Sequence, residues 1–162
     1  MGRWRPPSPK SSPYITAEGF KLLQNEQQAL WERRKHVTKA LSEAAAEGDR
    51  SENAEYIYRK KELREIDRRI RYLQKRLPNL KVVNEKPATQ DCIFFGAKVT
   101  LENDQGEEVQ YRIVGPDEIG KQNYISMDAP LARALLKKSI DDEVTIKTEF
   151  GARHFLILDI EY

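Results

Sequence analysis

Apolar residues recur at alternating spacings of three and four between Thr16 and Leu77, and no proline interrupts this stretch. Such spacing is typical of the a/d seam of a coiled coil, where a narrow apolar stripe faces a partner helix and charges cover the other faces. The seam positions are Phe20, Leu23, Gln27, Leu30, Arg34, Val37, Leu41 and Ala44, then Leu63, Ile66, Ile70, Leu73 and Leu77. Because the pattern breaks at Gly48, it predicts an antiparallel helical hairpin with arms about 40 Å long.

The break between the two arms is short and polar. Gly48 can end the first helix, and Asp49, Ser51 or Asn53 can cap the second. Asp49 and Glu52 also have the spacing of a capping box, in which the two side chains serve only to start a helix. From spacing alone, this capping interpretation is favoured over metal chemistry.

The second half of the chain changes character after Pro78 and Pro87. It contains five short β-prone runs separated by turn residues: 94–101, 108–114, 122–127, 143–147 and 155–160. Residues 130–138 predict one amphipathic helix, with Asp128 near its start. We therefore expect an α+β chain with a disordered tail (1–13), a coiled-coil hairpin (14–83) with its tip at 48–53, a linker (84–90) and an antiparallel β-sheet domain with one short helix (91–162).

Composition limits the classes of function. Charged residues make up 33% of the 162 residues, and no apolar run approaches the roughly 20 residues that span a bilayer, so we expect no membrane association. Cys92 is the single cysteine, which fits a reducing cytoplasm, and the isolated His36 and His154 exclude a Cys/His metal cluster. Residues 1–83 hold 19 Lys/Arg and 11 Asp/Glu, whereas the rest hold 9 and 15. The basic half is the one that would face nucleic acid.

Five short motifs follow one another along the two halves of the chain. They read GDRSENAEY at 48–56, KKELREIDRRI at 60–70, FFGA at 94–97, YIS at 124–126 and PLARALL at 130–136. Together they resemble the Gre family of bacterial transcript-cleavage factors, and the RSENAEY tip with its arginine-rich second arm resembles the GreB branch. The resemblance runs from about Tyr14 to Tyr162. It implies that the C-terminal domain has a fold similar to FK506-binding proteins.

The resemblance implies a specific role for the tip. In this family the hairpin enters the secondary channel of RNA polymerase and stimulates the polymerase's own hydrolysis of a backtracked RNA 3′ end. Asp49 and Glu52 match the family's tip carboxylates and would share Mg²⁺ with the polymerase, since Mg²⁺ takes one or two carboxylates and keeps several waters. The free protein would hold no stable cofactor and would be an activator of the polymerase, not a nuclease itself. Arg50, Ser51, Asn53 and Tyr56 would shape the tip, although Tyr56 could instead stack on a base.

The basic residues of the arms form a second candidate site. Many have acidic neighbours three or four residues away, as in Glu55/Arg59, Glu65/Arg69 and Asp67/Arg71, which is typical of an ordinary solvated helix surface. The excess of positive charge and the family resemblance favour binding of the extruded RNA, with DNA of the elongation complex as a further contact. The predicted RNA-binding face comprises Arg33, Arg34, Lys39, Arg59, Lys60, Lys61, Arg64 and Arg68. Arg34 is unusual because it occupies a seam position.

A third candidate site would dock the C-terminal domain on the polymerase. Ser126, Asp128, Ala129 and Pro130 match the loop that the family uses there, although Asp128 and Pro130 could simply initiate a helix. The chain departs from the family at Ala129, where serine is usual, and at 139–142 (SIDD), where the family commonly has a glycine before the aspartate. We expect a monomer in the cytoplasm, associated with the nucleoid through RNA polymerase.

Three other functions remain open. A polymerase regulator could bind the same channel and inhibit without inducing cleavage. A coiled-coil adaptor or general RNA-binding protein would not need its tip acids, and its binding would depend only on salt. A prolyl isomerase or chaperone would place its activity in residues 91–162 alone, although a fold does not fix a function.

Overall fold

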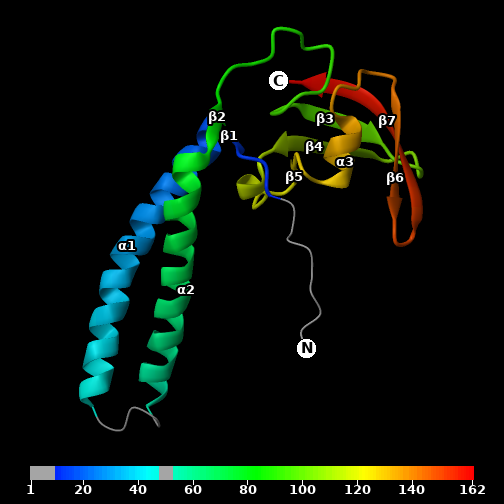
Figure 1. Ribbon diagram of the computed structural model, residues 1–162. Helices are drawn as coiled ribbons and strands as arrows, with labels where there is room; N and C mark the ends of the chain where they lie inside the picture. The colour runs from blue at the N-terminus through cyan, green and yellow to red at the C-terminus, as the bar shows by residue number, and fades with distance from the viewer. Residues whose placement is uncertain (1–9, 48–52) are drawn as a thin grey trace, which may run out of the picture. The chain divides into compact units, whose positions relative to one another are not determined.

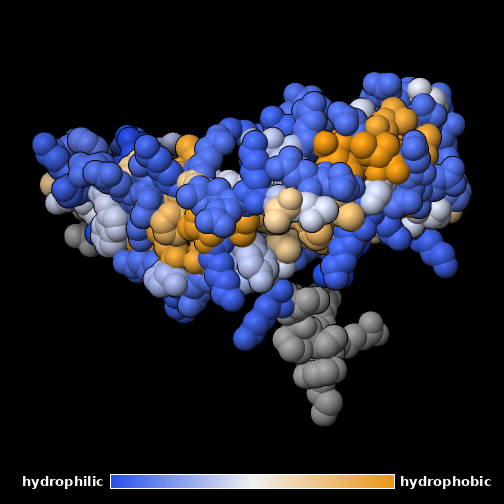
Figure 2. Space-filling model, turned by 90° about the horizontal axis from the view of Figure 1, so that it is seen from above, coloured by the Kyte–Doolittle hydropathy of each residue, from blue (hydrophilic) through white to orange (hydrophobic). Residues whose placement is uncertain are grey.

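A computed structural model describes residues 10–47 and 53–162 of the chain. The described chain divides into two compact units, one formed by residues 18–80 and the other by the segment ending at Ala17 together with residues 81–162. Hydrophilic residues cover most of the surface drawn in Figure 2, as a content of 33% charged residues leads one to expect.

The first unit is a helical hairpin. Helix α1 spans Ala17–Ala46 and helix α2 spans Ala54–Arg76, followed by the 3₁₀ turn η1 at Leu77–Asn79. The two helices lie side by side (Figure 1), and ion pairs from residue 26 to 69 and from residue 33 to 62 show that they are antiparallel. The predicted hairpin is therefore confirmed.

The seam of the hairpin is apolar and narrow. Val37, Ile66 and Ile70 form its buried cluster, with Leu30 and Leu63 packed against them. Most of the predicted seam positions are thus buried or half-buried, as the spacing of three and four requires.

A short pair of strands in the second unit was not predicted. Strand β1 (Tyr14–Thr16) pairs in parallel with strand β2 (Lys81–Val83), so that Tyr14 lies opposite Lys81. Three-residue strands show no useful periodicity, and the pairing joins residues far apart in the sequence. Local pattern could therefore not reveal it.

The rest of the second unit is a five-stranded sheet (Figure 1). Its strands are β3 (Lys98–Glu102), β4 (Glu108–Val114), β5 (Tyr124–Ser126), β6 (Glu143–Thr148) and β7 (Gly151–Glu161), arranged in the order β5-β4-β3-β7-β6. All neighbouring strands are antiparallel except β5, which pairs in parallel with β4. The predicted α+β architecture is confirmed, and the sheet is mostly rather than wholly antiparallel.

Two short helical segments complete this unit. The 3₁₀ turn η2 (Pro116–Glu118) follows β4, and helix α3 (Pro130–Leu135) follows β5. Ala132 and Leu135 of α3 are fully buried in one core cluster with residues of the sheet, among them Leu101, Ile113 and Ile157. Helix α3 thus packs on the sheet, but it ends earlier than the predicted boundary at residue 138, because Leu136 takes an extended ψ of 133° and Lys137 a positive φ of 68°.

Candidate nucleic-acid interface of the hairpin

The end of the hairpin is closed by Asn53. Its side chain accepts a hydrogen bond from the backbone N–H of Tyr56 (3.1 Å), which caps α2. The same side chain donates through Nδ2 to the carbonyl oxygen of Ala44 near the end of α1 (2.8 Å). One amide therefore joins the two helix ends, and of the three predicted caps Asn53 is the one that starts α2.

Four of the predicted tip residues, Asp49, Arg50, Ser51 and Glu52, lie outside the described residues. Tyr56 is described and half-buried on the first turn of α2. The Lys60 ammonium lies 5.8 Å from the centre of its ring, within the range of a cation–π contact. Both predicted roles of Tyr56, shaping the tip and stacking on a base, stay predictions.

The predicted basic face divides into two groups. Arg33, Arg34 and Arg59 are engaged in ion pairs: Arg33 with Glu62 (2.6 Å), Arg34 with Asp67 (2.7 Å) and Arg59 with both Glu55 and Glu62 (2.8 and 3.1 Å). In the described part of the chain, the other predicted cations form no ion pair. These are Lys39, Lys60, Lys61, Arg64 and Arg68.

Glu62 pairs with two of these arginines, Arg33 and Arg59. Burial raises the pKa of its carboxyl, but hydrogen bonds from Arg33 and Arg59 outweigh burial, and the pKa lies below its ordinary value. The hydrogen bond to Glu55, together with that to Glu62, raises the pKa of Arg59. Glu62 therefore stays ionised and links both helices through Arg33.

Two of the acid–base neighbours noted within α2 form their ion pairs with the facing helix. Arg69 pairs with Glu26 of α1 (2.7 Å) in place of Glu65, and Asp67 pairs with Arg34 of α1 in place of Arg71. The pair between Glu55 and Arg59 is confirmed. Residues on the flank of a hairpin can reach either their own helix or the facing one, and sequence spacing reveals only the first possibility.

The cations without an ion pair on α2 share one face, which we call the cationic stripe. At 100° per residue its members fall within about a third of the helix circumference, turned away from the buried Ile66, Ile70 and Leu73. The stripe comprises Lys60, Lys61, Arg64, Arg68, Arg71 and Lys75, and all six side chains are exposed. Four of these were predicted as RNA-binding. Lys75 was missed although its spacing from Arg71 and Arg68 continues the same period.

Helical geometry places no acidic residue within the cationic stripe. Like charges spaced by three and four repel each other, so a stripe of this kind costs some helix stability and attracts polyanions. Lys39 lies on α1, at a position opposite the seam of that helix, and is separate from the stripe. Of the predicted face, Lys60, Lys61, Arg64 and Arg68 lie in the cationic stripe, and the RNA-binding role of all eight residues stays a prediction.

Hydrogen bonds within the second unit fix the predicted docking loop. The carboxylate of Asp128 accepts hydrogen bonds from the backbone N–H (2.9 Å) and the hydroxyl of Ser12. The backbone N–H of Asp128 donates to the hydroxyl of Ser126 (3.1 Å). Ala129 is the N-cap of α3 and makes no side-chain cap, while Pro130 is its first residue. Pro130 thus starts the helix, but Asp128 does not cap it as the alternative had suggested.

Among the described residues, no group of three or more His, Cys, Asp or Glu side chains could hold a metal ion. Nor is any helix of the described ranges both long and apolar enough to cross a membrane.

Comparisons with known proteins agree with this architecture in both units. The N-terminal domain profile of transcription elongation factors matches residues 13–82, and the C-terminal profile of the GreA/GreB transcription elongation factors matches residues 88–162. The chain therefore belongs to the GreA/GreB family of transcription elongation factors.

Within this family the chain is GreB-like. It is 56% identical to the transcription elongation factor GreB of Pseudomonas aeruginosa, over 100% of this chain and 98% of that protein. It is 54% identical to GreB of Xanthomonas axonopodis pv. citri, again over 100% and 98%. Among solved structures, GreA factor homolog 1 (Gfh1) of Thermus thermophilus is 26% identical over 92% of this chain and 98% of that chain, with a TM-score of 0.40.

Proposed function

We propose that this protein binds bacterial RNA polymerase, inserts its hairpin into the secondary channel and stimulates the polymerase's own Mg²⁺-dependent cleavage of backtracked RNA. The extruded 3′ end is removed, and synthesis resumes from the new end. The protein would act in the cytoplasm as an activator, because the cleavage chemistry belongs to the polymerase. The proposal rests on membership of the elongation-factor family and on the architecture of the hairpin.

The observation that carries the proposal is the closure at Asn53. The hydrogen bond from Asn53 Nδ2 to the Ala44 carbonyl ties the helix ends, and residues 48–52 connect these ends in the sequence. Asp49 and Glu52 belong to this short connection. Two joined helices can therefore bring both carboxylates to the same place in a narrow channel.

The chemistry assigned to Asp49 and Glu52 follows from two-metal hydrolysis. One ion activates the attacking water, and the other stabilises the leaving oxygen of the phosphodiester. Two carboxylates can complete the coordination of a loosely held Mg²⁺ and orient the attacking water. Neither carboxylate forms an active site by itself, since the polymerase supplies the remaining ligands.

The cationic stripe would guide the extruded RNA. Phosphates attract Lys and Arg without regard to sequence, and a single strand needs such a groove along its backbone. The stripe runs along α2, from Lys60 one turn past Tyr56 to Lys75 near the other end of the helix. Lys39, Arg33, Arg34 and Arg59 would contribute less, because three of them are ion-paired and Lys39 lies apart from the stripe.

A backtracked elongation complex with end-labelled RNA tests the proposal. We expect wild-type protein to release a 3′ fragment rapidly, and Asp49→Asn/Glu52→Gln to slow release on the order of 100-fold at equal occupancy. Glu47→Gln is the matched control, because it removes a carboxylate beside the tip but outside the Asp49/Glu52 pair. Binding without cleavage by the wild type would favour an inhibitory channel regulator, and absence of binding would refute the polymerase assignment.

A further inference from the structure

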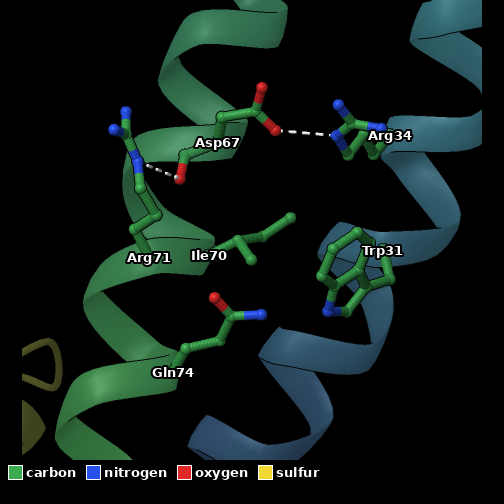
Figure 3. Close-up of a pocket in the computed structure, with 6 residues that line it drawn as sticks. All are labelled: Trp31, Arg34, Asp67, Ile70, Arg71 and Gln74. Carbon is green, nitrogen blue, oxygen red and sulfur yellow. Dashed lines mark hydrogen bonds and ion pairs between the residues drawn. The ribbon is translucent and has the colours of Figure 1, made fainter.

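The two flanks of the hairpin differ. On one flank Arg33, Glu62, Arg69 and Glu26 form ion pairs that bridge α1 and α2. The opposite flank contains an open hollow of about 500 Å³ between the helices. It is lined by Trp31, Arg34, Asp67, Ile70, Arg71 and Gln74 (Figure 3), and we call it the Trp31 pocket.

The pocket presents an aromatic ring beside an apolar floor. Trp31 extends from α1 toward α2 and is 42% exposed, while Ile70 is 3% exposed and extends toward α1 (Figure 3). The Arg34 guanidinium lies 6.0 Å from the centre of the Trp31 ring and is fixed by its ion pair with Asp67. The indole is thus held in place from one side by Arg34, and part of its surface remains accessible.

The polar side chains that line the pocket are compatible with hydrogen bonding to a nucleobase. Gln74 extends toward α1 (Figure 3). No hydrogen bond joins its side-chain amide to another described residue. An amide carries both a donor and an acceptor, which is what the edge of a nucleobase requires. Asp67 is the only acid in the pocket, and Arg34 neutralises it at 2.7 Å.

The pocket adjoins the cationic stripe, because Arg71 belongs to both. Lys60 and Arg64 lie on the same edge of the stripe as Arg71, by their spacing on the helix. A chain of phosphates along this edge would bring its bases to the level of Trp31. Cations for the backbone combined with an aromatic platform for the base are the two components of single-strand recognition.

We propose that the Trp31 pocket binds one unpaired nucleobase of a single-stranded RNA whose phosphates follow the cationic stripe. Trp31 stacks on the base, Gln74 hydrogen-bonds to its edge, and Arg71 contacts the adjoining phosphate. The inference rests on the proposed function, which supplies the extruded RNA. Arg71 lies about 25 Å along α2 from Ala54, so the bound base is several nucleotides away from the RNA that reaches the tip.

Fluorescence of Trp31 provides a direct test. The sequence has two tryptophans, so Trp4→Phe in the full chain leaves Trp31 as the only reporter. At low salt, an oligoadenylate of about 12 nucleotides should quench Trp31 and bind about 5- to 100-fold more tightly than an abasic ribose-phosphate oligomer of equal length. Equal affinity for the two oligomers, RNA binding without a quench, or no binding at low salt would each overturn the proposal.

Substitutions separate stacking from general binding. With labelled RNA, Trp31→Leu should reduce affinity to the level of the abasic oligomer, and Trp31→Phe should retain most of it. Tyr72→Leu is the matched control, because Tyr72 is also an exposed aromatic residue on the hairpin (41%) but does not line the pocket. Equal losses for Trp31→Leu and Tyr72→Leu would overturn the proposal. So would a loss of affinity for RNA-free polymerase confined to Trp31→Leu, since the pocket would then dock protein.

These measurements need no polymerase activity, so they distinguish the two proposals. A wild-type protein that stimulates cleavage but shows no base-dependent binding would retain the proposed function and lose the Trp31 pocket. A protein with base-dependent binding and no effect on cleavage would keep the pocket and lose the proposed function.

Discussion

Gly115 lies where the N-terminal strand β1 crosses the sheet unit. A Cβ atom at this position would meet the carbonyl oxygen of Tyr14 at 1.9 Å, although the backbone itself is in an ordinary conformation (φ −71°). The carboxylate of Glu118 accepts hydrogen bonds from the backbone N–H groups of Gly115 (2.9 Å) and Thr16 (3.1 Å). Close approach of the two backbones, and not conformational freedom, is therefore what requires glycine here.

Gly115→Ala should destabilise the sheet unit by about 1–3 kcal/mol, because the backbone of β1 must move away from the added methyl group. Thermal or denaturant unfolding measures this loss. Gly120→Ala is the matched control, since a Cβ atom there meets nothing within 4 Å. If Gly120→Ala lost as much stability as Gly115→Ala, the close approach of β1 to Gly115 could not be the cause of the loss.

Asp141 takes a positive φ of 71° in the SIDD segment, where the family resemblance of the sequence implies a glycine before the aspartate. Side chains other than glycine are disfavoured in this left-handed region, although aspartate tolerates it better than most. The departure therefore adds a small local strain in the turn before β6 and does not affect the candidate interface.

Asp141→Gly should raise the free energy of unfolding by about 0.5–1 kcal/mol, because it removes the Cβ atom from a left-handed position. Asp141→Ala serves as the control that removes the carboxylate and keeps the Cβ atom. We expect Asp141→Gly, and not Asp141→Ala, to raise the Tm. Equal stabilisation by alanine would assign the effect to charge and not to backbone conformation.

The hairpin as an element is strengthened by ion pairs between α1 and α2, among them the pair of Arg33 with Glu62. Glu62 is ionised over a wider pH range than usual, because its folded-state pKa is lowered by Arg33 and Arg59 despite burial. A lowered pKa in the folded state contributes stability above the ordinary pKa of the carboxyl, and this stability is lost as the pH falls through the folded value.

Glu62→Gln should lower the stability of the hairpin by about 0.5–1 kcal/mol near neutral pH, since both ion pairs are lost. The difference from wild type should shrink as the pH falls below the ordinary pKa of a glutamate and through the lowered folded-state pKa, because Glu62 is then protonated. The helical circular dichroism signal followed through thermal unfolding at each pH gives both values. Glu32→Gln is the control, because Glu32 is exposed and pairs only with exposed Lys35. A pH-independent difference would contradict the assigned role of Glu62.

The sequence predicted the hairpin because every seam contact follows one local period, and the two arms match in that period. Local sequence patterns also placed helix α3 and the five strands β3 to β7 near their observed positions. The partner of Arg34 and the pairing of β1 with β2 were not predictable, because each joins residues distant in the chain. The ion pairs of Arg33 and Arg34 across the hairpin were not predictable either, since cations paired across a hairpin look the same in sequence as solvated ones.

For the whole molecule, the two halves of the sequence carry opposite net charge, and the basic half contains the hairpin. This asymmetry suits a molecule whose hairpin approaches nucleic acid while the other unit contacts protein. Our proposal gives separate tasks to parts of one chain: the cationic stripe would guide RNA, Asp49 and Glu52 would supply carboxylates to Mg²⁺, and the loop of Ser126 and Pro130 would dock on the polymerase.

The central claim is that Asp49 and Glu52 bind the Mg²⁺ that the polymerase holds loosely. The most direct test is the rate of cleavage in backtracked complexes as a function of Mg²⁺ concentration, at saturating protein. Wild-type protein should reach half-maximal cleavage at a Mg²⁺ concentration about 10-fold or more below that for Asp49→Asn/Glu52→Gln. An identical Mg²⁺ midpoint for the two proteins, with only the maximum rate reduced in the variant, would contradict the claim.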